Sequence, residues 1–436
     1  MNQIPAEQAG GRLSLPWVSV LIFVSSCFLY AVSPQSKPLY PDLAQGAEIT
    51  HVALSLVQHG SFADPFFARP TGPTAHTPPM YVFLYALVAK VFGIGMTGVW
   101  VLTALNVAFL ALQLALLPVL SERLGLGVAP GALAAVFGAV VQPYRVLVGW
   151  ESLFVGALLV VLCVLTLSDF KKPGGWWRRS LLLGLLWGVT ILANPECVLL
   201  LFMWAHIASM ENSPEMLLRA RRAMVVVVAG AALACLPWFI RNYQQFHSVF
   251  FVRDNFGLEL FTSNNSCARP TMLENLLSGC HVLTHPNGNP YIAGEVAEKG
   301  EIQFNQEMLH HALSWISSNP RAFAWLTARR FLRFWFPYLG SYRYSIPMGV
   351  LTVLSFAGLV WMYREKRNAA MLLASTLLVY PLVHYLVQFE ARYRYPIFWA
   401  TLLPAAFVIM RITTWLHKAR MASPSADKKE EELMPA

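Results

Sequence analysis

The stretch TGVWVLTALNVAFLALQLALLPVL occupies residues 97–120 and contains no Asp, Glu, Lys or Arg. A helix needs roughly 20 apolar residues to cross a bilayer core, so this stretch predicts a membrane-spanning helix. The whole 436-residue chain has the same character, because 56% of its residues are hydrophobic and 13% are charged. An average soluble domain has roughly 25% charged residues. The composition therefore predicts a multi-pass membrane protein.

Short basic clusters beside the apolar blocks predict the topology. The net charge is +9, which here indicates membrane topology more than nucleic-acid binding. By the positive-inside rule, all the clusters should face the cytoplasm, so an even number of spans must separate each pair. The clusters are 171–179, 219–222, 364–367 and 417–420.

Ten spans meet this requirement and place both chain termini in the cytoplasm. The scheme needs 79–92 to be a juxtamembrane or half-inserted helix, because an extra span there would put the 171–179 cluster outside. The expected spans are 13–32, 97–120, 128–143, 152–169, 180–195, 197–210, 223–240, 346–363, 369–388 and 396–414.

The expected fold is an all-α bundle of about ten spans with juxtamembrane helices and a small α-rich periplasmic domain. An amphipathic helix at 47–59, ended by Gly60, should lie in the first outer loop. Two helices, 308–318 and 320–336, should lie in the second, whereas 262–300 reads as irregular and 423–436 as disordered. The expected regions are 1–240 (transmembrane, including the first outer loop at 33–96), 241–345 (periplasmic loop domain), 346–414 (transmembrane) and 415–436 (cytoplasmic tail).

Two of the six cysteines lie in the large polar loop, whereas the other four lie in apolar blocks and read as small buried side chains. Cys267 and Cys280 could form a disulfide if that loop faces an oxidising compartment. Two free thiols are the alternative.

Ionisable residues at the outer ends of the spans are candidate functional groups, because charge is costly there. Glu48 opens the amphipathic helix, and Glu151 and Glu196 each start a span. The alternative for each is an acid that only stabilises a helix start. For Glu196 we favour a simpler interpretation, in which its charge complements a helix start. Arg241 and Asn242 follow the seventh span, where an Arg often serves only as a headgroup anchor.

The segment 390–396, Glu-Ala-Arg-Tyr-Arg-Tyr-Pro, is the sharpest signal. It places Arg392 and Arg394 in a short outer turn, against the positive-inside tendency. A guanidinium group offers a planar fork of donors that matches phosphate oxygens. This segment therefore predicts an anion site, and an interfacial belt paired with Glu390 is the alternative.

Taken in order, several motifs resemble the GT-C glycosyltransferases that use polyprenyl-phosphate sugars. The resemblance is to bacterial protein mannosyltransferases and aminoarabinose transferases, of glycosyltransferase family 39 type, and it covers roughly residues 40–400. The motifs are Glu48-Ile-Thr-His-Val-Ala53 with Gly60-Ser-Phe62, His76-Thr-Pro-Pro-Met-Tyr-Val-Phe-Leu84 with Val91-Phe-Gly93, Gln142-Pro-Tyr144 with Trp150-Glu151, Asn194-Pro-Glu196, Leu236-Pro-Trp-Phe-Ile-Arg-Asn-Tyr243 and Arg392-Tyr-Arg-Tyr-Pro396.

The resemblance implies an inverting transfer of a sugar to an acceptor hydroxyl on the periplasmic face. Glu48 matches the position of the family's proposed catalytic base, although Ala47 and Gln45 stand where many members carry a further acid. A carboxylate can take the hydroxyl proton, and cations can stabilise the leaving phosphate. The residues expected at the donor phosphate are Arg392, Arg394 and Arg241, and those expected at substrate are His76, Tyr81, Glu151, Tyr393 and Asn242.

The expected partners are a polyprenyl-phosphate-linked sugar, a lipid, glycan or envelope-polymer acceptor, and membrane lipids, with no nucleic acid. No cofactor is expected, because His51, His59 and His76 match no zinc spacing, although some relatives use a divalent ion. The absence of a targeting peptide and the short loops predict a bacterial inner membrane. Two rival functions stay open: a flippase or transporter of lipid-linked glycans, and a non-catalytic assembly protein.

Overall fold

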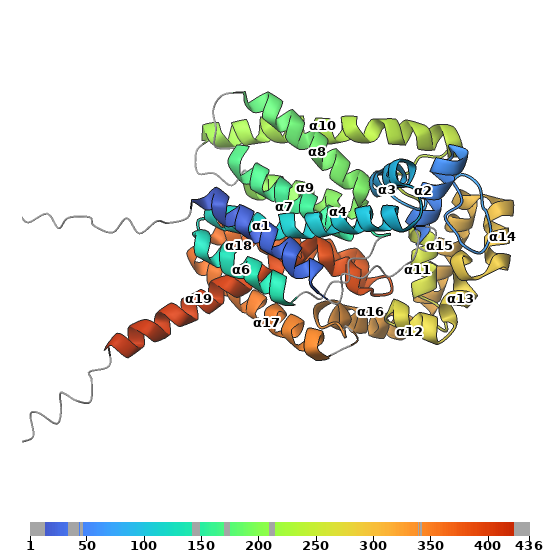
Figure 1. The fold of residues 1–436 in the computed structure, drawn as a ribbon. Coiled ribbons are helices and arrows are strands. Elements are labelled where there is room, and N and C mark those ends of the chain that lie inside the picture. Colours follow the sequence, from blue (N-terminus) through green and yellow to red (C-terminus); the bar gives the residue numbers. More distant parts are fainter. Residues whose placement is uncertain are drawn as a thin grey trace, which may run out of the picture.

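In the computed structural model the described residues are helical, with two isolated bridges and no strand among them (Figure 1). They are residues 14–33, 43, 47–141, 149–169, 175–208, 214–338, 340 and 342–422. The expected disordered tail at 423–436 and the Gln142-Pro-Tyr144 motif lie outside these residues.

Every expected span coincides with a helix or with two consecutive helical elements. Among the described residues, five helices are long and apolar enough to cross a membrane on their own: Met96–Arg123, Leu217–Phe246, Ser345–Glu365, Arg367–Tyr385 and Ala391–Arg420. The chain is therefore a membrane protein, and the count of ten spans stays a prediction. The bundle consists of α1 (Leu15–Ala31), α4 (Met96–Ala115), α5 (Leu117–Arg123), α6 (Val128–Val141), α7 (Ser152–Asp169), α8 (Trp176–Ala193), α9 (Val198–Ala208), α10 (Pro214–Phe246), α17 (Tyr342–Glu365), α18 (Arg367–Val379) and α19 (Phe398–Ala422).

Small residues allow helices of the bundle to approach closely. Where α8 crosses α10, a Cβ added at Gly184 would lie 2.3 Å from the Val227 carbonyl oxygen and 3.0 Å from the Gly230 Cα. Close packing of this kind is a main attraction between helices in lipid. The lipid tails are as apolar as the helix surfaces, so the hydrophobic effect does not drive the helices together. A larger side chain at Gly184 would force the two helices apart.

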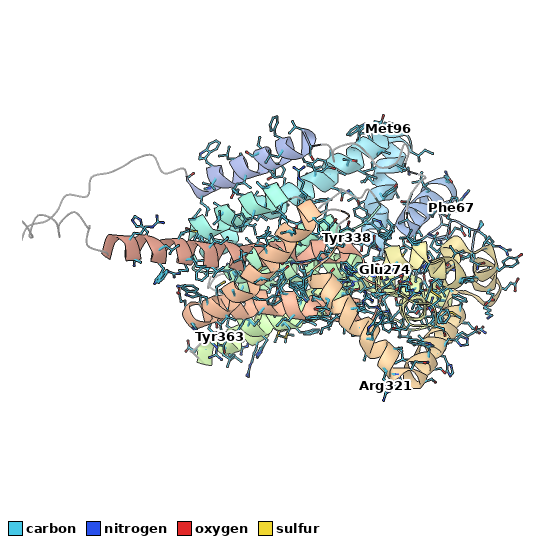
Figure 2. All side chains as sticks on the ribbon, turned by 90° about the horizontal axis from the view of Figure 1, so that it is seen from below. Phe67, Met96, Glu274, Arg321, Tyr338 and Tyr363 are labelled. Atoms are coloured by element: carbon cyan, nitrogen blue, oxygen red, sulfur yellow. A yellow bond between two sulfur atoms is a disulfide. The ribbon has the colours of Figure 1, made fainter. Side chains whose placement is uncertain are left out.

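The remaining helices gather at one end of the bundle, which we call the outer end (Figure 1). Figure 2 labels Phe67 and Glu274 at this end and Tyr363 near the opposite end. The helices of the outer end are α2 (Glu48–His59), α3 (Pro79–Phe92), α11 (Phe256–Ser263), α12 (Met272–Leu277), α13 (Cys280–Thr284), η3 (Pro286–Gly288), α14 (Pro290–Lys299), α15 (Glu301–Ser318) and α16 (Pro320–Trp335).

The amphipathic helix of the first outer loop is confirmed. The helix α2 buries Ile49, Val52 and Ala53 and ends at Gly60, whose φ of 69° is the left-handed conformation that glycine adopts without strain. The helices around Asn319 are also confirmed, and α15 starts at Glu301, seven residues before the expected position.

The expectation that 262–300 is irregular was wrong, because this stretch contains α12, α13, η3 and α14. Its Thr and Asn residues are helix caps. The Thr271 hydroxyl accepts from the Glu274 backbone N–H, and the Asn289 side chain accepts from the N–H groups of Tyr291 and Ile292. Such caps satisfy the free N–H groups at a helix start. The same residue types also favour turns, which is why the sequence predicted irregular structure at 262–300.

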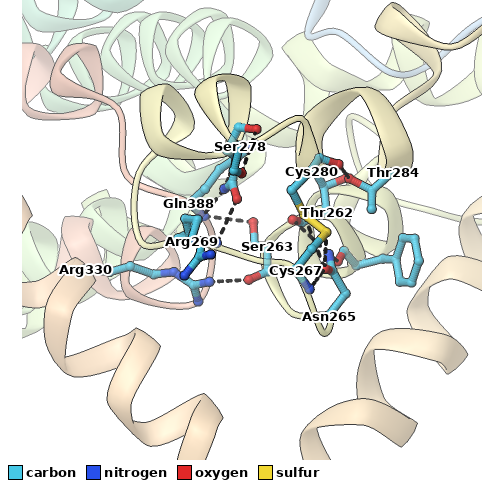
Figure 3. The surroundings of a disulfide bond; sticks show 12 residues. Thr262, Ser263, Asn265, Cys267, Arg269, Ser278, Cys280, Thr284, Arg330 and Gln388 are labelled. Carbon is cyan, nitrogen blue, oxygen red and sulfur yellow. Dashed lines mark hydrogen bonds between the residues drawn. A yellow bond between two sulfur atoms is a disulfide. The ribbon is translucent and has the colours of Figure 1, made fainter.

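One buried arginine connects the helices of the outer end to the bundle. The Arg330 side chain is fully buried and donates to Ser263 O, to Asn264 Oδ1 (3.1 Å) and to Leu386 O (2.8 Å). Figure 3 shows Arg330 beside Ser263 and Gln388. This network ties α16, α11 and the turn after α18 into one unit.

Candidate functional site

Glu48, the first residue of α2, lies beside two histidines that come from distant parts of the chain. One carboxylate oxygen of Glu48 and one ring nitrogen each of His76 and His285 all lie within 4.8 Å of one another. His76 precedes α3 and His285 follows α13. We call these three residues the Glu48 half of the candidate site.

Both histidines are held neutral by burial. Desolvation, followed by the nearby Arg253 and His285, lowers the pKa of His76 well below its usual value, and burial lowers the pKa of His285 to about 4. The Nδ1 of His285 accepts a hydrogen bond from the Asn287 backbone N–H at 3.1 Å. A neutral imidazole carries one proton, so that of His285 lies on Nε2. His285 is therefore a hydrogen-bond donor toward its surroundings.

The backbone around His76 is held by the second outer loop. The Glu301 carboxylate accepts from the Thr74 hydroxyl and from the Ala75 N–H at 2.6 Å, and the Ala75 carbonyl accepts from the Asp254 N–H at 3.0 Å. Burial raises the pKa of Glu301 to about 8 and that of Asp254 to about 6. The two outer loops thus fix the position of His76 together.

Arg241 and Asn242 brace the first outer loop against α10. The Arg241 guanidinium donates to Thr74 O at 2.8 Å and to Phe62 O at 3.0 Å. Asn242 is buried, and its amide donates to Val252 O at 3.3 Å. The structure therefore places both residues next to the Glu48 half, with their polar groups bonded to protein backbone.

Arg392 is the centre of a second group of residues, which we call the Arg392 half. Its guanidinium carbon lies 3.2 Å from the centre of the Trp150 ring, and its Nε lies 2.5 Å from a carboxylate oxygen of Glu390. The same guanidinium carbon lies 4.8 Å from the centre of the Tyr393 ring. Stacking on an aromatic face leaves the edge of a guanidinium free to donate, so this geometry presents N–H groups to an anion.

Arg394 has a different environment although it lies two residues further on. It is 2% exposed and donates to Trp335 O at 2.9 Å and to the Thr352 hydroxyl at 2.7 Å. These contacts join the last span to α16 and α17. The structure therefore brings Arg392, and not Arg394, to the surface of the candidate site.

Direct contacts connect the two halves at the outer end. Gly149 lies against the start of α2, since a Cβ there would lie 3.8 Å from the Ala47 nitrogen, one residue before Glu48. The next residue, Trp150, carries the stacked Arg392. Two consecutive residues, Gly149 and Trp150, thus link the start of α2 to the Arg392 guanidinium.

Electrostatics give the same picture. Burial raises the pKa of Glu259 on α11, Arg253 and Arg392 lower it, and Glu48 raises it. The Glu259 carboxylate therefore lies within electrostatic reach of both Glu48 and Arg392. The Nε of Arg253 is buried and has no hydrogen-bond partner in the described part of the chain. Arg253 thus adds a second cation between the halves.

A further acid, Glu196, belongs to the Arg392 half. Its backbone N–H donates to the Asn194 side chain at 3.0 Å, and its carboxylate lies 3.0 Å from the His384 Nε2. The His384 ring stacks on Tyr393 with 4.4 Å between ring centres and faces Phe334 on its other side. Glu196 therefore stands at a helix start and also lies against the imidazole that stacks on Tyr393.

The other two predicted substrate residues lie deeper. Tyr81 is fully buried, and its hydroxyl accepts from the Asn106 amide at 2.8 Å. Glu151 is 8% exposed, and one of its carboxylate oxygens has no hydrogen-bond partner among the residues that the structure describes. Glu151 directly follows Trp150, the residue on which Arg392 stacks.

The sequence reading missed four residues of the site: Arg253, Glu259, His285 and His384. Arg253 and Glu259 lie in the second outer loop, where a lone charged residue is ordinary. His285 lies in a segment that was expected to be irregular. The His384 of Val-His-Tyr lies inside an expected span, and the rarity of ionisable residues within spans is the signal that could have identified it.

The Glu48 half has residue types that can bind a metal ion. Glu48, His76 and His285 are close enough to share one ion, whereas His51 and His59 are not part of the group. A metal-bound imidazole normally donates its second ring N–H to an acceptor. In His285 that second nitrogen instead accepts a backbone N–H. The proton arrangement therefore fits a carboxylate with histidine neighbours better than a metal centre.

The predicted all-α membrane bundle, with further helices gathered at its outer end, is confirmed in the described residues. No family model matches the chain, and no curated protein matches it in sequence.

Solved structures give the closer comparison. The archaeal oligosaccharyltransferase AglB from Archaeoglobus fulgidus, in complex with an inhibitory peptide and a dolichol-phosphate, has a TM-score of 0.55 and 15% identity, over 92% of this chain and 51% of that one. The apo form of the oligosaccharyltransferase from the same organism has a TM-score of 0.56 and 15% identity, over 95% and 52%. This chain thus spans about half the length of these neighbours, and the likeness shows the fold. ArnT from Cupriavidus metallidurans also matches, with 15% identity over 89% of this chain and 77% of that one, at a TM-score of 0.34.

Proposed function

We propose that the chain is a membrane glycosyltransferase that moves a sugar from a polyprenyl phosphate to an acceptor hydroxyl at the outer face. The observation that carries the proposal is that Gly149 lies against the start of α2 while the next residue, Trp150, stacks on Arg392, so that Glu48 and Arg392 share one end of the bundle. The charges of both residues also act on the Glu259 carboxylate. A lipid phosphate in the outer leaflet would reach this end from the bilayer. The oligosaccharyltransferase with the same fold was solved with a dolichol-phosphate, which supports this donor class.

In the proposed reaction Glu48 is the general base. It takes the proton of the acceptor hydroxyl as that oxygen attacks the anomeric carbon, and the bond from that carbon to the phosphate oxygen breaks. Attack from the side opposite the phosphate inverts the anomeric centre. His285 and His76 hold the carboxylate in place, and general-base catalysis of this kind contributes roughly 10²- to 10⁴-fold to a rate.

Arg392 and Arg253 form the proposed phosphate site. The leaving lipid phosphate gains negative charge, and fixed cations that await this charge lower the barrier. Arg392 is held rigid by Trp150 and by Glu390. Arg394 and Arg241, which were expected at the phosphate, are proposed instead to support it indirectly, because both bond to backbone carbonyls.

Further parts of the proposal rest on sequence. We place the chain in a bacterial inner membrane with both termini in the cytoplasm and the site facing the periplasm, because the four basic clusters then lie inside. We propose residues 241–345 as the periplasmic domain between two transmembrane regions, 1–240 and 346–414, with 415–436 as the tail. No metal is assigned to the reaction.

The test is sugar transfer from a radiolabelled polyprenyl-phosphate sugar in membranes that contain the full chain. We expect Glu48→Gln to reduce transfer at least ~100-fold, with Glu295→Gln, an exposed acid on α14, as the matched control. Wild-type transfer rates for Glu48→Gln would refute the assignment of the base. Movement of the labelled donor across vesicles without a new glycosidic bond would favour the flippase, and neither transfer nor movement would favour the assembly protein.

A further inference from the structure

A groove on the outer domain, away from the candidate site, has the character of a carbohydrate site. Its volume is about 540 Å³, within the roughly 300–1,000 Å³ that small-molecule sites occupy. It lies between α15 and the loop that the Cys267–Cys280 disulfide closes. Residues that line it include Phe261, Asn265, Thr284, His311, Ser314 and Trp315.

One side of the groove is a polar stripe along α15. His311, Ser314, Trp315 and Ser318 recur at three- and four-residue spacing, which places them on one face of the helix. The indole N–H groups of Trp204, Trp238 and other buried tryptophans are donated within the chain. That of Trp315 has no acceptor among the residues that the structure describes.

The other side is pre-formed by the disulfide. Figure 3 shows Asn265 and Thr284 on one side of the Cys267–Cys280 bond, with Ser263 and Arg330 on the other. Asn265 accepts from the Cys267 N–H at 2.9 Å and donates to Phe261 O at 2.9 Å. A fixed turn of this kind costs little ordering when a ligand binds.

The lining chemistry indicates an uncharged polyol. No Asp, Glu, Lys or Arg lines the groove among the described residues, and His311 is the titratable side chain that lies there, so no permanent charge favours an ion. Aromatic rings pack on the C–H faces of sugars, and hydroxyl and amide groups exchange hydrogen bonds with their hydroxyls. The aromatic groups are Phe261 and Trp315, and the short polar groups are Ser, Thr and Asn.

The groove lies one helix away from the candidate site. Glu259 and Phe261 are two positions apart on α11, roughly 200° around the helix axis. The charges of Glu48 and Arg392 act on the Glu259 carboxylate, whereas Phe261 lines the groove. A helix is roughly 10 Å across, so a chain of sugars that starts at the site could cross α11 to the groove.

We infer that this groove binds a neutral oligosaccharide, and that it holds the glycan of the acceptor at a distance from the reacting hydroxyl. The identification of the ligand as the acceptor rests on the proposed function. The inference that the groove binds a neutral saccharide is independent of the proposed function.

The test measures binding of maltopentaose, chitopentaose and mannopentaose to the full chain in nanodiscs, which avoid detergents with sugar headgroups. Saturation-transfer NMR and titration should show binding of at least one probe. Trp315→Ala should weaken it about tenfold, as expected for a truncated aromatic anchor, and Trp315→Phe should retain most of it. The matched control is Trp325→Ala on α16, a 51% exposed tryptophan outside the groove.

Two outcomes would overturn the inference: no probe binds, or Trp315→Ala and Trp325→Ala weaken binding equally. Glu48→Gln should bind the probes as the wild type does. If that variant transfers sugar normally while groove binding still depends on Trp315, the proposed base fails and the groove stands. If transfer depends on Glu48 but no probe binds, only the groove fails.

Discussion

The Glu48 half and the Arg392 half of the candidate site are built in opposite ways. The Glu48 half is assembled from three segments far apart in sequence, and its histidines are neutral and buried. In the Arg392 half, Glu390, Arg392 and Tyr393 belong to one short segment and contact one another, and Trp150 joins them from elsewhere in the chain. The difference teaches that the base depends on how the outer loops pack, whereas the cation depends on local chain geometry together with one packed aromatic ring.

The largest expected effect separates Arg392 from Arg394, which lies two residues further on and outside the candidate site. Arg392→Ala should reduce transfer by roughly 10²- to 10³-fold, because it removes a fixed charge at the leaving group, and should leave the melting temperature nearly unchanged. Arg394→Ala should instead destabilise the fold by roughly 1–3 kcal/mol, because it removes the buried guanidinium that donates to Trp335 O and to the Thr352 hydroxyl. Transfer assays and thermal melts of both variants would check this. Equal losses of transfer at unchanged stability would contradict it.

His285→Gln should have the next largest effect. Loss of the donor beside Glu48 lets the carboxylate move, and misplacement of a reacting group by about 1 Å can cost roughly 10²-fold in rate. The variant should lower the rate at saturating substrate more than it raises the Michaelis constant. His310→Gln, an exposed histidine on α15, is the control. Chelation by EDTA should leave wild-type transfer unchanged, and loss of transfer that zinc restores would show that the Glu48 half is a metal centre.

Replacing the disulfide tests how rigid the outer domain must be. Cys267→Ser with Cys280→Ser removes a bond with a sequence separation of 13 residues, and bonds over loops of this length contribute roughly 2–4 kcal/mol. We expect a lower melting temperature and a smaller effect on transfer than from His285→Gln. Denaturant unfolding under oxidising and reducing conditions would measure it, and reductant should affect only the wild type. No change in stability would contradict the role given to this bond.

Much of this comparison was accessible from the sequence, and the reasons are physical. Apolar blocks and basic clusters identified where the helices of the bundle lie, because the bilayer imposes length and charge rules on each span separately. Glu48 and Arg392 stood out for the same reason, as charges at span ends. His285 and Arg253 did not, because only tertiary packing brings them from the second outer loop to Glu48. The short helices between 262 and 300 were missed because their Asn and Thr caps look like turn residues.

The smallest expected effect concerns Glu301, whose carboxylate accepts hydrogen bonds from Thr74 and Ala75 just before His76. Burial raises the pKa of Glu301 to about 8, above the roughly 4.3 of an unfolded chain. Its contribution to stability is therefore greatest at pH 4 and is lost as the pH rises toward 8. The melting temperature of the wild type should fall relative to that of Glu301→Gln over this range. Calorimetry at several pH values would show it, with Glu298→Gln as an exposed control, and a parallel pH dependence of wild type and Glu301→Gln would contradict it.

The most direct measurement is a cryo-electron microscopy map of the full chain in a nanodisc, with a non-hydrolysable polyprenyl-phosphonate sugar bound. The proposed function predicts phosphonate density at Arg392 and Arg253, with the anomeric carbon turned toward Glu48. Phosphonate density elsewhere, or a sugar on the far side of the bundle from Glu48, would contradict it.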